Sequence, residues 1–128
     1  MLMYSANRRV FIATAATDLR KSYDGLSALV EGTFERDLRH GDLFVFLNRR
    51  ATQMRVLYWH RHGYCIWMQR LEAGTFRRIS DADGSDIIEI EAAELAMMLE
   101  GIDTAVIRRR KRYGLPESEP DGRSILNA

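Results

Sequence analysis

At 128 residues, 46% of them hydrophobic, and with a formal net charge of +1, the chain has the size and apolar content of one compact domain. Its apolar runs are shorter than the roughly 20 residues that span a membrane, and its first residues lack a secretory-signal pattern, so we expect a cytoplasmic protein without a membrane segment. The single cysteine, Cys65, excludes an internal disulfide and any multi-cysteine zinc cluster within one chain.

The first predicted elements are a strand over residues 8–14 and a helix over residues 18–35. The strand is rich in β-branched and aromatic residues, and the helix carries apolar residues at three- and four-residue spacing. Thr17 or Asp18 is expected to cap the helix, because their side-chain oxygens can accept from its free N–H groups. Gly25, in the middle of the helix, indicates close packing against another backbone.

A turn is predicted at residues 39–42, before a strand over residues 43–50. The first five residues of this strand, LFVFL, are all apolar. A strand that is apolar on both faces is typical of the interior of a sheet that is covered on both sides.

Two further strands are predicted over residues 54–60 and 64–71, joined as a hairpin across Arg-His-Gly. Together they contain both tryptophans, two tyrosines and the cysteine. We expect the face that carries Met54, Val56 and Tyr58 to be the core side.

Two registers of this hairpin remain open. In the first, residues 62–63 form a two-residue turn, and Arg55 lies opposite Arg70. Like charges in such a pair are destabilising, so an anionic partner nearby would relieve them. In the second, His60 pairs with Tyr64 across a bulge, the two arginines are diagonal, and this reasoning weakens.

The remaining elements are a strand at 75–79, a turn at 81–84, a strand at 86–90 and a helix at 92–101 that ends on a glycine. We therefore predict one α+β domain over residues 1–113, followed by a mobile tail over residues 114–128. Its fold is a mostly antiparallel sheet of four to five strands with a central hairpin, packed by the two helices on one side.

Catalytic and metal chemistry finds little support in the sequence. His60, His62 and Cys65 offer ligand atoms, but zinc needs four ligands, or three and a water, and we expect structural roles for them. The acidic residues cluster in 81–103, which favours a solvated face over a two-metal site. Phosphate loops, dinucleotide fingerprints and nucleophile elbows are absent, so we expect no enzyme activity, no cofactor and no metal.

Arginine is the notable residue of this chain, since only Lys21 and Lys111 of its 19 basic residues are lysines. Arginine favours polyanions or ion-paired interfaces, although a GC-rich genome accounts for this usage equally well. Contact with nucleic acid and an arginine-rich protein interface are equally favoured. The residues predicted to bind nucleic acid are Arg49, Arg50, Arg55, Arg61, Arg70, Arg77 and Arg78, with Arg108, Arg109, Arg110, Lys111 and Arg112 as an auxiliary arm.

Four blocks of sequence occur in an order that resembles one family. These blocks are TDLRKSYDGL, GDLFVFLNRR, LYWHRHGYCIW and LEGI. The chain is similar to the small accessory proteins, often called TnpB, that bacterial insertion sequences of the insertion-sequence-66 type encode beside their transposase. The resemblance spans about residues 8–105.

The resemblance implies a non-catalytic helper of transposition that works with the transposase and another accessory protein. Its implied task is binding of DNA at the element ends, or assembly of the transposition complex. The alternative is a protein-interaction adaptor that docks on the transposase without touching DNA. The acidic segment could also meet basic patches on a second copy and give a homo-oligomer.

Overall fold

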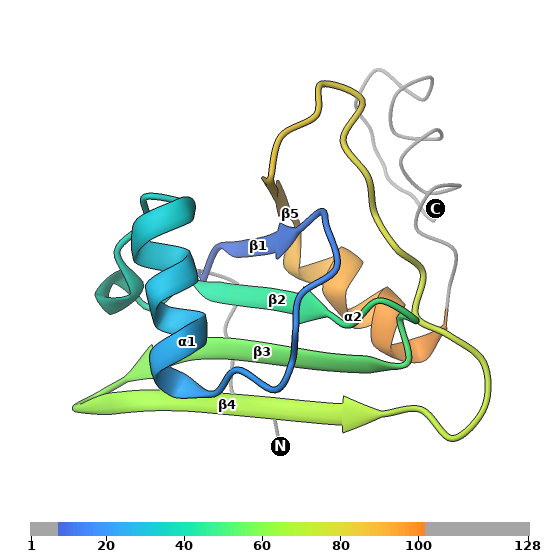
Figure 1. The fold of residues 1–128 in the computed structure, drawn as a ribbon, viewed down its shortest axis with the longest axis horizontal. Coiled ribbons are helices and arrows are strands. Elements are labelled where there is room, and N and C mark those ends of the chain that lie inside the picture. The colour runs from blue at the N-terminus through green and yellow to red at the C-terminus, as the bar shows by residue number, and fades with distance from the viewer. Residues whose placement is uncertain (1–7, 102–128) are drawn as a thin grey trace.

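The computed structural model describes residues 8–101, which form one five-stranded sheet with helices packed against it (Figure 1). The strand order is β4-β3-β2-β1-β5, in which β1 and β2 are parallel and the other neighbours are antiparallel. The expected α+β fold with a mostly antiparallel sheet is therefore confirmed. The elements are β1 (Val10–Ala13), α1 (Tyr23–Ala28), the π-helix η1 (Leu29–Thr33), the 3-10 helix η2 (Leu38–His40), β2 (Leu43–Leu47), β3 (Gln53–His60), β4 (Gly63–Arg70), β5 (Ile87–Ile90) and α2 (Ala92–Glu100).

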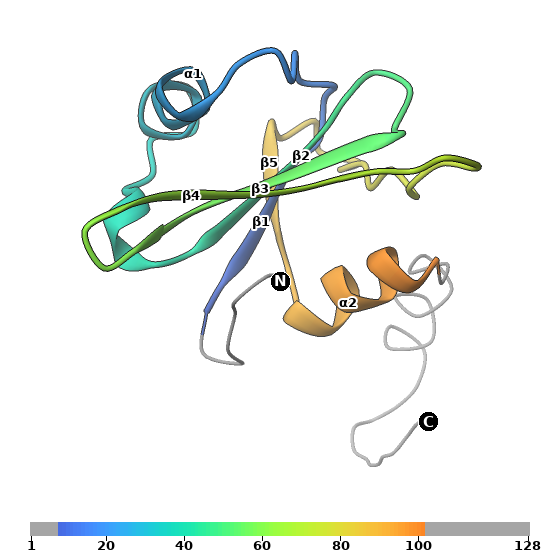
Figure 2. The same ribbon diagram turned by 90° about the horizontal axis from the view of Figure 1, so that it is seen from below.

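The sheet packs into two separate cores, one on each face, because successive residues of a strand point to opposite sides. Phe11 and Phe44 stack with ring centroids 5.4 Å apart in the core that contains Leu26 of α1. Val45 belongs to the other core, with Leu95 of α2. We call these two clusters the core of α1 and the core of α2. Figure 2 shows the two helices on opposite sides of the sheet. The expectation that both helices cover one side is wrong, because β1 and β2 are buried on both faces and each face needs a cover.

Helix α1 begins at Tyr23 rather than near residue 18, and its N-cap is Ser22, whose side chain makes no capping hydrogen bond. Neither expected cap is used. The carboxylate of Asp18 instead accepts from Nε and Nη2 of Arg20, at 3.0 and 2.8 Å. Oδ1 of Asp18 also accepts from the N–H of Arg20, at 3.0 Å, so Asp18 shapes a separate turn before α1 and does not cap the helix.

Gly25 does not mark the approach of another backbone, as was expected. A Cβ built at this position would lie 2.9 Å from the Cβ of Lys21. The glycine thus makes room for the side chain of the segment that leads into α1. Beyond α1 the helix widens into η1, and the expected end of the helix near residue 35 is confirmed.

The hairpin turn consists of Arg61 and His62, with His60 paired to Gly63, and neither expected register describes it. Arg61 adopts a φ of 59°, which favours glycine, while Gly63 lies within β4. The pairing of the apolar strand residues therefore outweighs the turn preference of the single glycine.

Compared with the first expected register, the observed one is shifted by two residues, so each face keeps its members but their partners change. Arg55 lies opposite Met68, not Arg70, and the expected like-charge pair does not form. The face that was expected to be the core side belongs to the core of α2. Leu57 on the other face is equally buried, in the core of α1. Both faces of β3 are thus core faces.

Residues 75–79 do not form the expected strand. Phe76 and Ile79 are both buried in the core of α2. Residues three positions apart would point to opposite faces of a strand, so burial of both requires an irregular backbone. The N–H of Phe76 donates to the carbonyl of Ala51, at 2.7 Å, which ties this segment to the loop between β2 and β3.

The last described elements follow the expectation. A turn at residues 81–84 precedes β5, and α2 ends at Gly101 with a φ of 82°. Glu91 and Glu94 form a capping box, each side chain meeting the backbone of the other. Glu94 is buried, so the expected solvated acidic face does not include it. The predicted boundary between domain and tail lies outside the described residues.

Candidate nucleic-acid interface

The loop between β2 and β3 is shaped by the side chain of Asn48. Its Oδ1 accepts from the N–H groups of Thr52 and Gln53, at 2.9 and 3.0 Å. Its Nδ2 donates to the hydroxyl of Thr52, at 3.2 Å. Ala51 takes a φ of 57° with its side chain in the core of α2. This internally bonded loop presents Arg49 and Arg50 to solvent.

The irregular segment 71–79 brings two more arginines to the same loop. Because Phe76 is anchored in the core, Arg77 and Arg78 follow it directly at the surface of the β2–β3 loop. Nη2 of Arg78 donates to the carbonyls of Asn48 and Arg49, at 2.5 and 3.3 Å. Nη1 of Arg78 is buried without a hydrogen-bond partner among the described residues.

We call Arg49, Arg50, Arg77 and Arg78 the arginine cluster. They line a pocket of about 530 Å³ together with Phe76 and with Met98 and Gly101 at the end of α2. Arg49 and Arg50 also border a second pocket of about 600 Å³, which Thr17, Asp18 and Arg20 line from the other side. Within residues 8–101, neither Arg49 nor Arg50 forms a salt bridge. Four guanidinium groups are therefore gathered where two loops meet.

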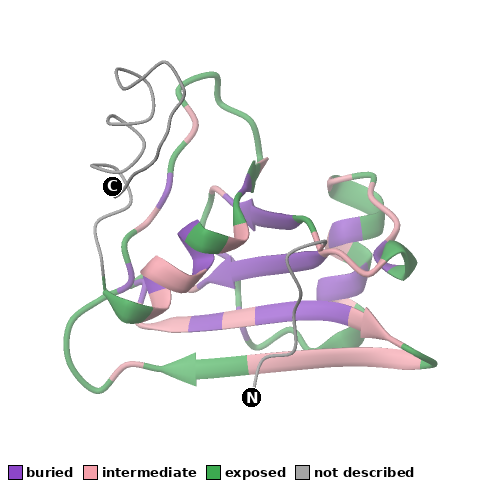
Figure 3. Cartoon of the chain, turned by 180° about the vertical axis from the view of Figure 1, so that it is seen from behind, coloured by how far each residue is buried: buried purple, intermediate pink, exposed green. Residues whose placement is uncertain are grey.

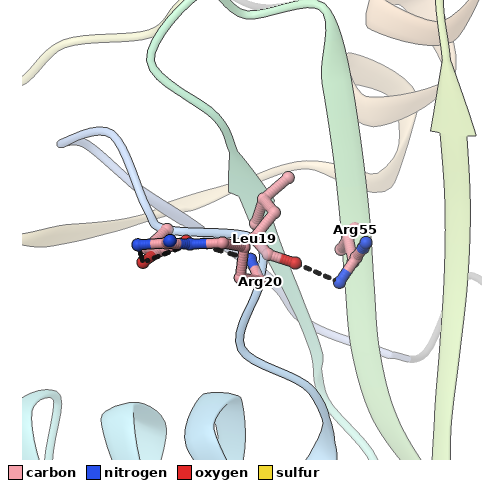
Figure 4. A network of polar contacts seen from close by, with 4 residues as sticks. Leu19, Arg20 and Arg55 are labelled. Carbon is pink, nitrogen blue, oxygen red and sulfur yellow. Dashed lines mark hydrogen bonds and ion pairs between the residues drawn. The ribbon is translucent and has the colours of Figure 1, made fainter.

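Arg55, which was predicted to bind nucleic acid, is held within the fold. Its Nη1 donates to the carbonyl of Leu19, as Figure 4 shows, and to the carbonyl of Lys21 at 3.1 Å. The side chain thereby fixes the chain that connects β1 to α1 onto β3. We assign Arg55 a structural role.

Arg20, whose side chain extends away from Arg55 in Figure 4, was not predicted as a site residue. Its guanidinium is already paired with Asp18, and this hydrogen-bonded pair lowers the pKa of that carboxyl to about 2. The pair therefore stays ionised at neutral pH. It offers less free positive charge than the exposed Arg49 and Arg50.

The other predicted arginines lie apart or are paired. Arg61 is exposed at the hairpin tip, and the length of β3 separates it from the arginine cluster. Arg70 is the last residue of β4, at the same end of the sheet as the cluster. Its Nε lies 3.1 Å from Oε2 of Glu72. The auxiliary arm at 108–112 lies outside the described residues.

Cys65 and the histidines of the hairpin do not come together as a site. Cys65 is half-buried and packs against the core of α2, while His62 is exposed in the turn. Within residues 8–101, no group of three or more histidine, cysteine, aspartate or glutamate side chains is placed to hold a metal ion. Over the same range, no helix has the length and apolar character needed to cross a bilayer.

Sequence reasoning missed Asn48 and Phe76, the residues that organise the arginine cluster. A signal for Asn48 was present, since an asparagine beside a polar turn often bonds to backbone N–H groups. A signal for Phe76 was its spacing of three from Ile79, which does not fit a strand.

Comparison with known proteins gives a consistent result over most of the chain. A family model described as IS66 Orf2 like protein matches residues 8–109. The uncharacterized protein y4hO of Sinorhizobium fredii is 35% identical over 103 residues, which cover 80% of this chain and 88% of that protein. The uncharacterized protein y4jC of the same organism is 30% identical over 110 residues, covering 86% and 92%. No solved structure matches the chain significantly.

Proposed function

The chain belongs to the family of IS66 Orf2 like proteins, and from this premise we propose that it assists transposition by binding DNA through the arginine cluster. The family associates the chain with the movement of an insertion sequence. The proposal adds a molecular task, contact with the phosphates of the element ends, and a place on the molecule where this contact is made.

The gathering of four arginines from two loops around one pocket is the observation that carries the proposal. A guanidinium group donates two parallel N–H groups to a phosphate and keeps its charge at every physiological pH. Arg49 and Arg50 are exposed at the tip of the loop, where a phosphate can reach their guanidinium groups.

Carboxylates lie both near the cluster and away from it. Asp18 shares the second pocket with Arg49 and Arg50 but is paired with Arg20, and the exposed Glu100 directly precedes Gly101, which lines the first pocket. The capping box of α2, Glu91 and Glu94, lies at the opposite end of the helix from Gly101, which lines the pocket. A helix of nine residues separates its ends by about 13 Å, beyond the Debye length of about 8–10 Å at physiological salt. The carboxylates of the capping box therefore weaken the positive potential at the cluster only slightly.

The test compares variants in binding to a fluorescent DNA duplex that carries an element end. We expect Arg49→Ala/Arg50→Ala to bind about tenfold more weakly than the unchanged chain, because each lost phosphate contact forfeits counterion release. Each single variant should lose part of this affinity. Arg39→Ala removes one charge in η2, which precedes β2 at the end of the sheet away from the cluster, and serves as the matched control for the single variants.

Equal losses for Arg39→Ala and for the single cluster variants would mean that net charge alone drives binding, and would refute a site at this loop. Unchanged DNA affinity in the double variant would refute it as well. If the double variant keeps its DNA affinity but no longer captures purified transposase, the adaptor function replaces the proposed one.

A further inference from the structure

The two edges of the sheet differ in how they are protected. Strand β5 has four residues, and its Glu89 is bonded to Arg9 of the neighbouring segment, at 2.9 Å. Strand β4 has eight residues and contains no proline and no charged residue before Arg70. Folded proteins usually block an edge with short strands, charges or prolines, because an open edge pairs with other chains. Within residues 8–101, strand β4 is such an open edge.

The views of the structure agree with this description. In Figure 1 no helix or strand of the described chain lies below β4, on its outer side. Figure 3 shows β4 half-buried along most of its length and exposed at its end. Met68 in this exposed part is 61% accessible, the largest value among the large hydrophobic residues of the described chain.

The backbone groups that β4 leaves unpaired can be identified from its pairing with β3. The N–H of Leu71 donates to the carbonyl of Thr52, at 2.8 Å, so odd-numbered residues of β4 point their backbone groups at β3. The even-numbered residues point theirs away from the sheet. These outward residues are Tyr64, Ile66, Met68 and Arg70.

A second copy of β4 can pair with all four outward residues in one antiparallel register, the one centred on Trp67. Ile66 of each copy then lies opposite Met68 of the other, and Tyr64 lies opposite Arg70. Apolar residues therefore meet apolar residues, and each guanidinium meets an aromatic ring instead of a second guanidinium. Every other symmetric register leaves some of these backbone groups unpaired.

Charges at the ends of the strand complement each other in the same register. Two residues beyond Arg70, Glu72 would lie beside the hairpin tip of the second copy, opposite His62 and next to Arg61. The Glu72 side chain is 80% exposed although it pairs with Arg70 of its own chain, and Arg61 and His62 are exposed, so Glu72 can contact both basic groups. An acidic residue at one end of β4 thus faces a basic tip at the other.

We propose that two copies of the chain associate through β4 in this antiparallel register and form one continuous sheet across a twofold axis. The proposal does not depend on DNA binding. It differs from the head-to-tail contact between acidic and basic segments considered from the sequence, because both copies use the same surface. The two arginine clusters would lie at opposite ends of the shared sheet.

A disulfide placed by one substitution tests both the association and its register. Gln69 is exposed, and the register puts it opposite Cys65 of the second copy in a pair without backbone hydrogen bonds. The Cα atoms of such a pair are about 4.5 Å apart, within the range of a disulfide. Within one chain, positions 65 and 69 are about 13 Å apart along the strand and cannot be bridged.

We expect Gln69→Cys to form a covalent dimer on mild oxidation, visible on a non-reducing gel. Two controls should stay monomeric: Gln69→Cys/Cys65→Ser, which lacks the partner thiol, and Arg70→Cys, whose position lies opposite Tyr64. A monomeric Gln69→Cys protein, or equal cross-linking of Arg70→Cys, would overturn the proposed register.

Sedimentation of the chain without an introduced cysteine tests the association in the absence of a covalent bond. We expect Arg61→Glu and Glu72→Arg each to weaken dimerisation by about threefold, as for an exposed ion pair, and the double swap to restore it. Thermal unfolding of each variant checks that the fold is retained. A chain that remains monomeric at high concentration, or a double swap weaker than either single variant, would overturn the proposal.

Discussion

Replacing Phe76 by alanine is expected to lower the free energy of unfolding by about 3–5 kcal/mol, the usual range for a buried phenylalanine. Phe76 is 4% exposed and belongs to the core of α2, although the segment around it has no regular secondary structure. For a domain of this size each kcal/mol shifts the melting temperature by about 4–8 °C, so Phe76→Ala should melt more than about 10 °C lower. Thermal and urea unfolding measure both quantities.

The exposed neighbour Thr75 supplies the matched control, and Thr75→Ala should change stability by less than about 0.5 kcal/mol. Because Phe76 places Arg77 and Arg78, we also expect Phe76→Ala to bind DNA more weakly at temperatures where it remains folded. A loss of stability below about 1 kcal/mol would show that the 71–79 segment is not anchored by this ring.

Replacing Arg55 by methionine is expected to lower the free energy of unfolding by about 2–3 kcal/mol, since hydrogen bonds from a charged group contribute about 1.5–3 kcal/mol. The substitution keeps the apolar stem but removes the donors to the carbonyls of Leu19 and Lys21. Urea unfolding measures the loss. Arg50→Met, in an exposed position, is the control and should stay within about 0.5 kcal/mol.

These variants also separate a structural arginine from a DNA-binding one. Arg55→Met should lose stability and retain most of its DNA affinity. Arg50→Met should retain its stability and lose DNA affinity. If Arg55→Met kept its stability and lost DNA binding, its guanidinium would belong to the interface, as the sequence alone predicted.

The elements that the sequence predicts well are those whose own residues determine them. The five apolar residues of β2 require burial on both faces, and Gly101 after an apolar helical stripe ends α2. The start of α1 was predicted too early, because Asp18 accepts from the N–H and the guanidinium of Arg20 in a separate turn that ends before α1 begins. Local patterns are reliable where no distant or competing partner intervenes.

The sequence predicted that the candidate site is rich in arginine, but not which arginines come together in space. An arginine-rich surface follows from the sequence, yet nothing local distinguishes Arg55, held by two backbone carbonyls, from the exposed Arg50. The meeting of Arg49 with Arg77 depends on Phe76 entering the core, which is a tertiary contact. Arg61 lies apart from the others because it is in the hairpin turn, at the opposite end of β3 from the cluster.

Binding of an element-end duplex across a range of salt concentrations tests the DNA-binding role of the arginine cluster most directly. The logarithm of the binding constant should fall linearly with the logarithm of salt, by about 0.9 for each phosphate neutralised. Because other basic segments remain in both proteins, the difference between the unchanged chain and Arg49→Ala/Arg50→Ala isolates the cluster. We predict that the slope of the double variant is shallower by about 1.8. Identical slopes would contradict phosphate contact by these two arginines.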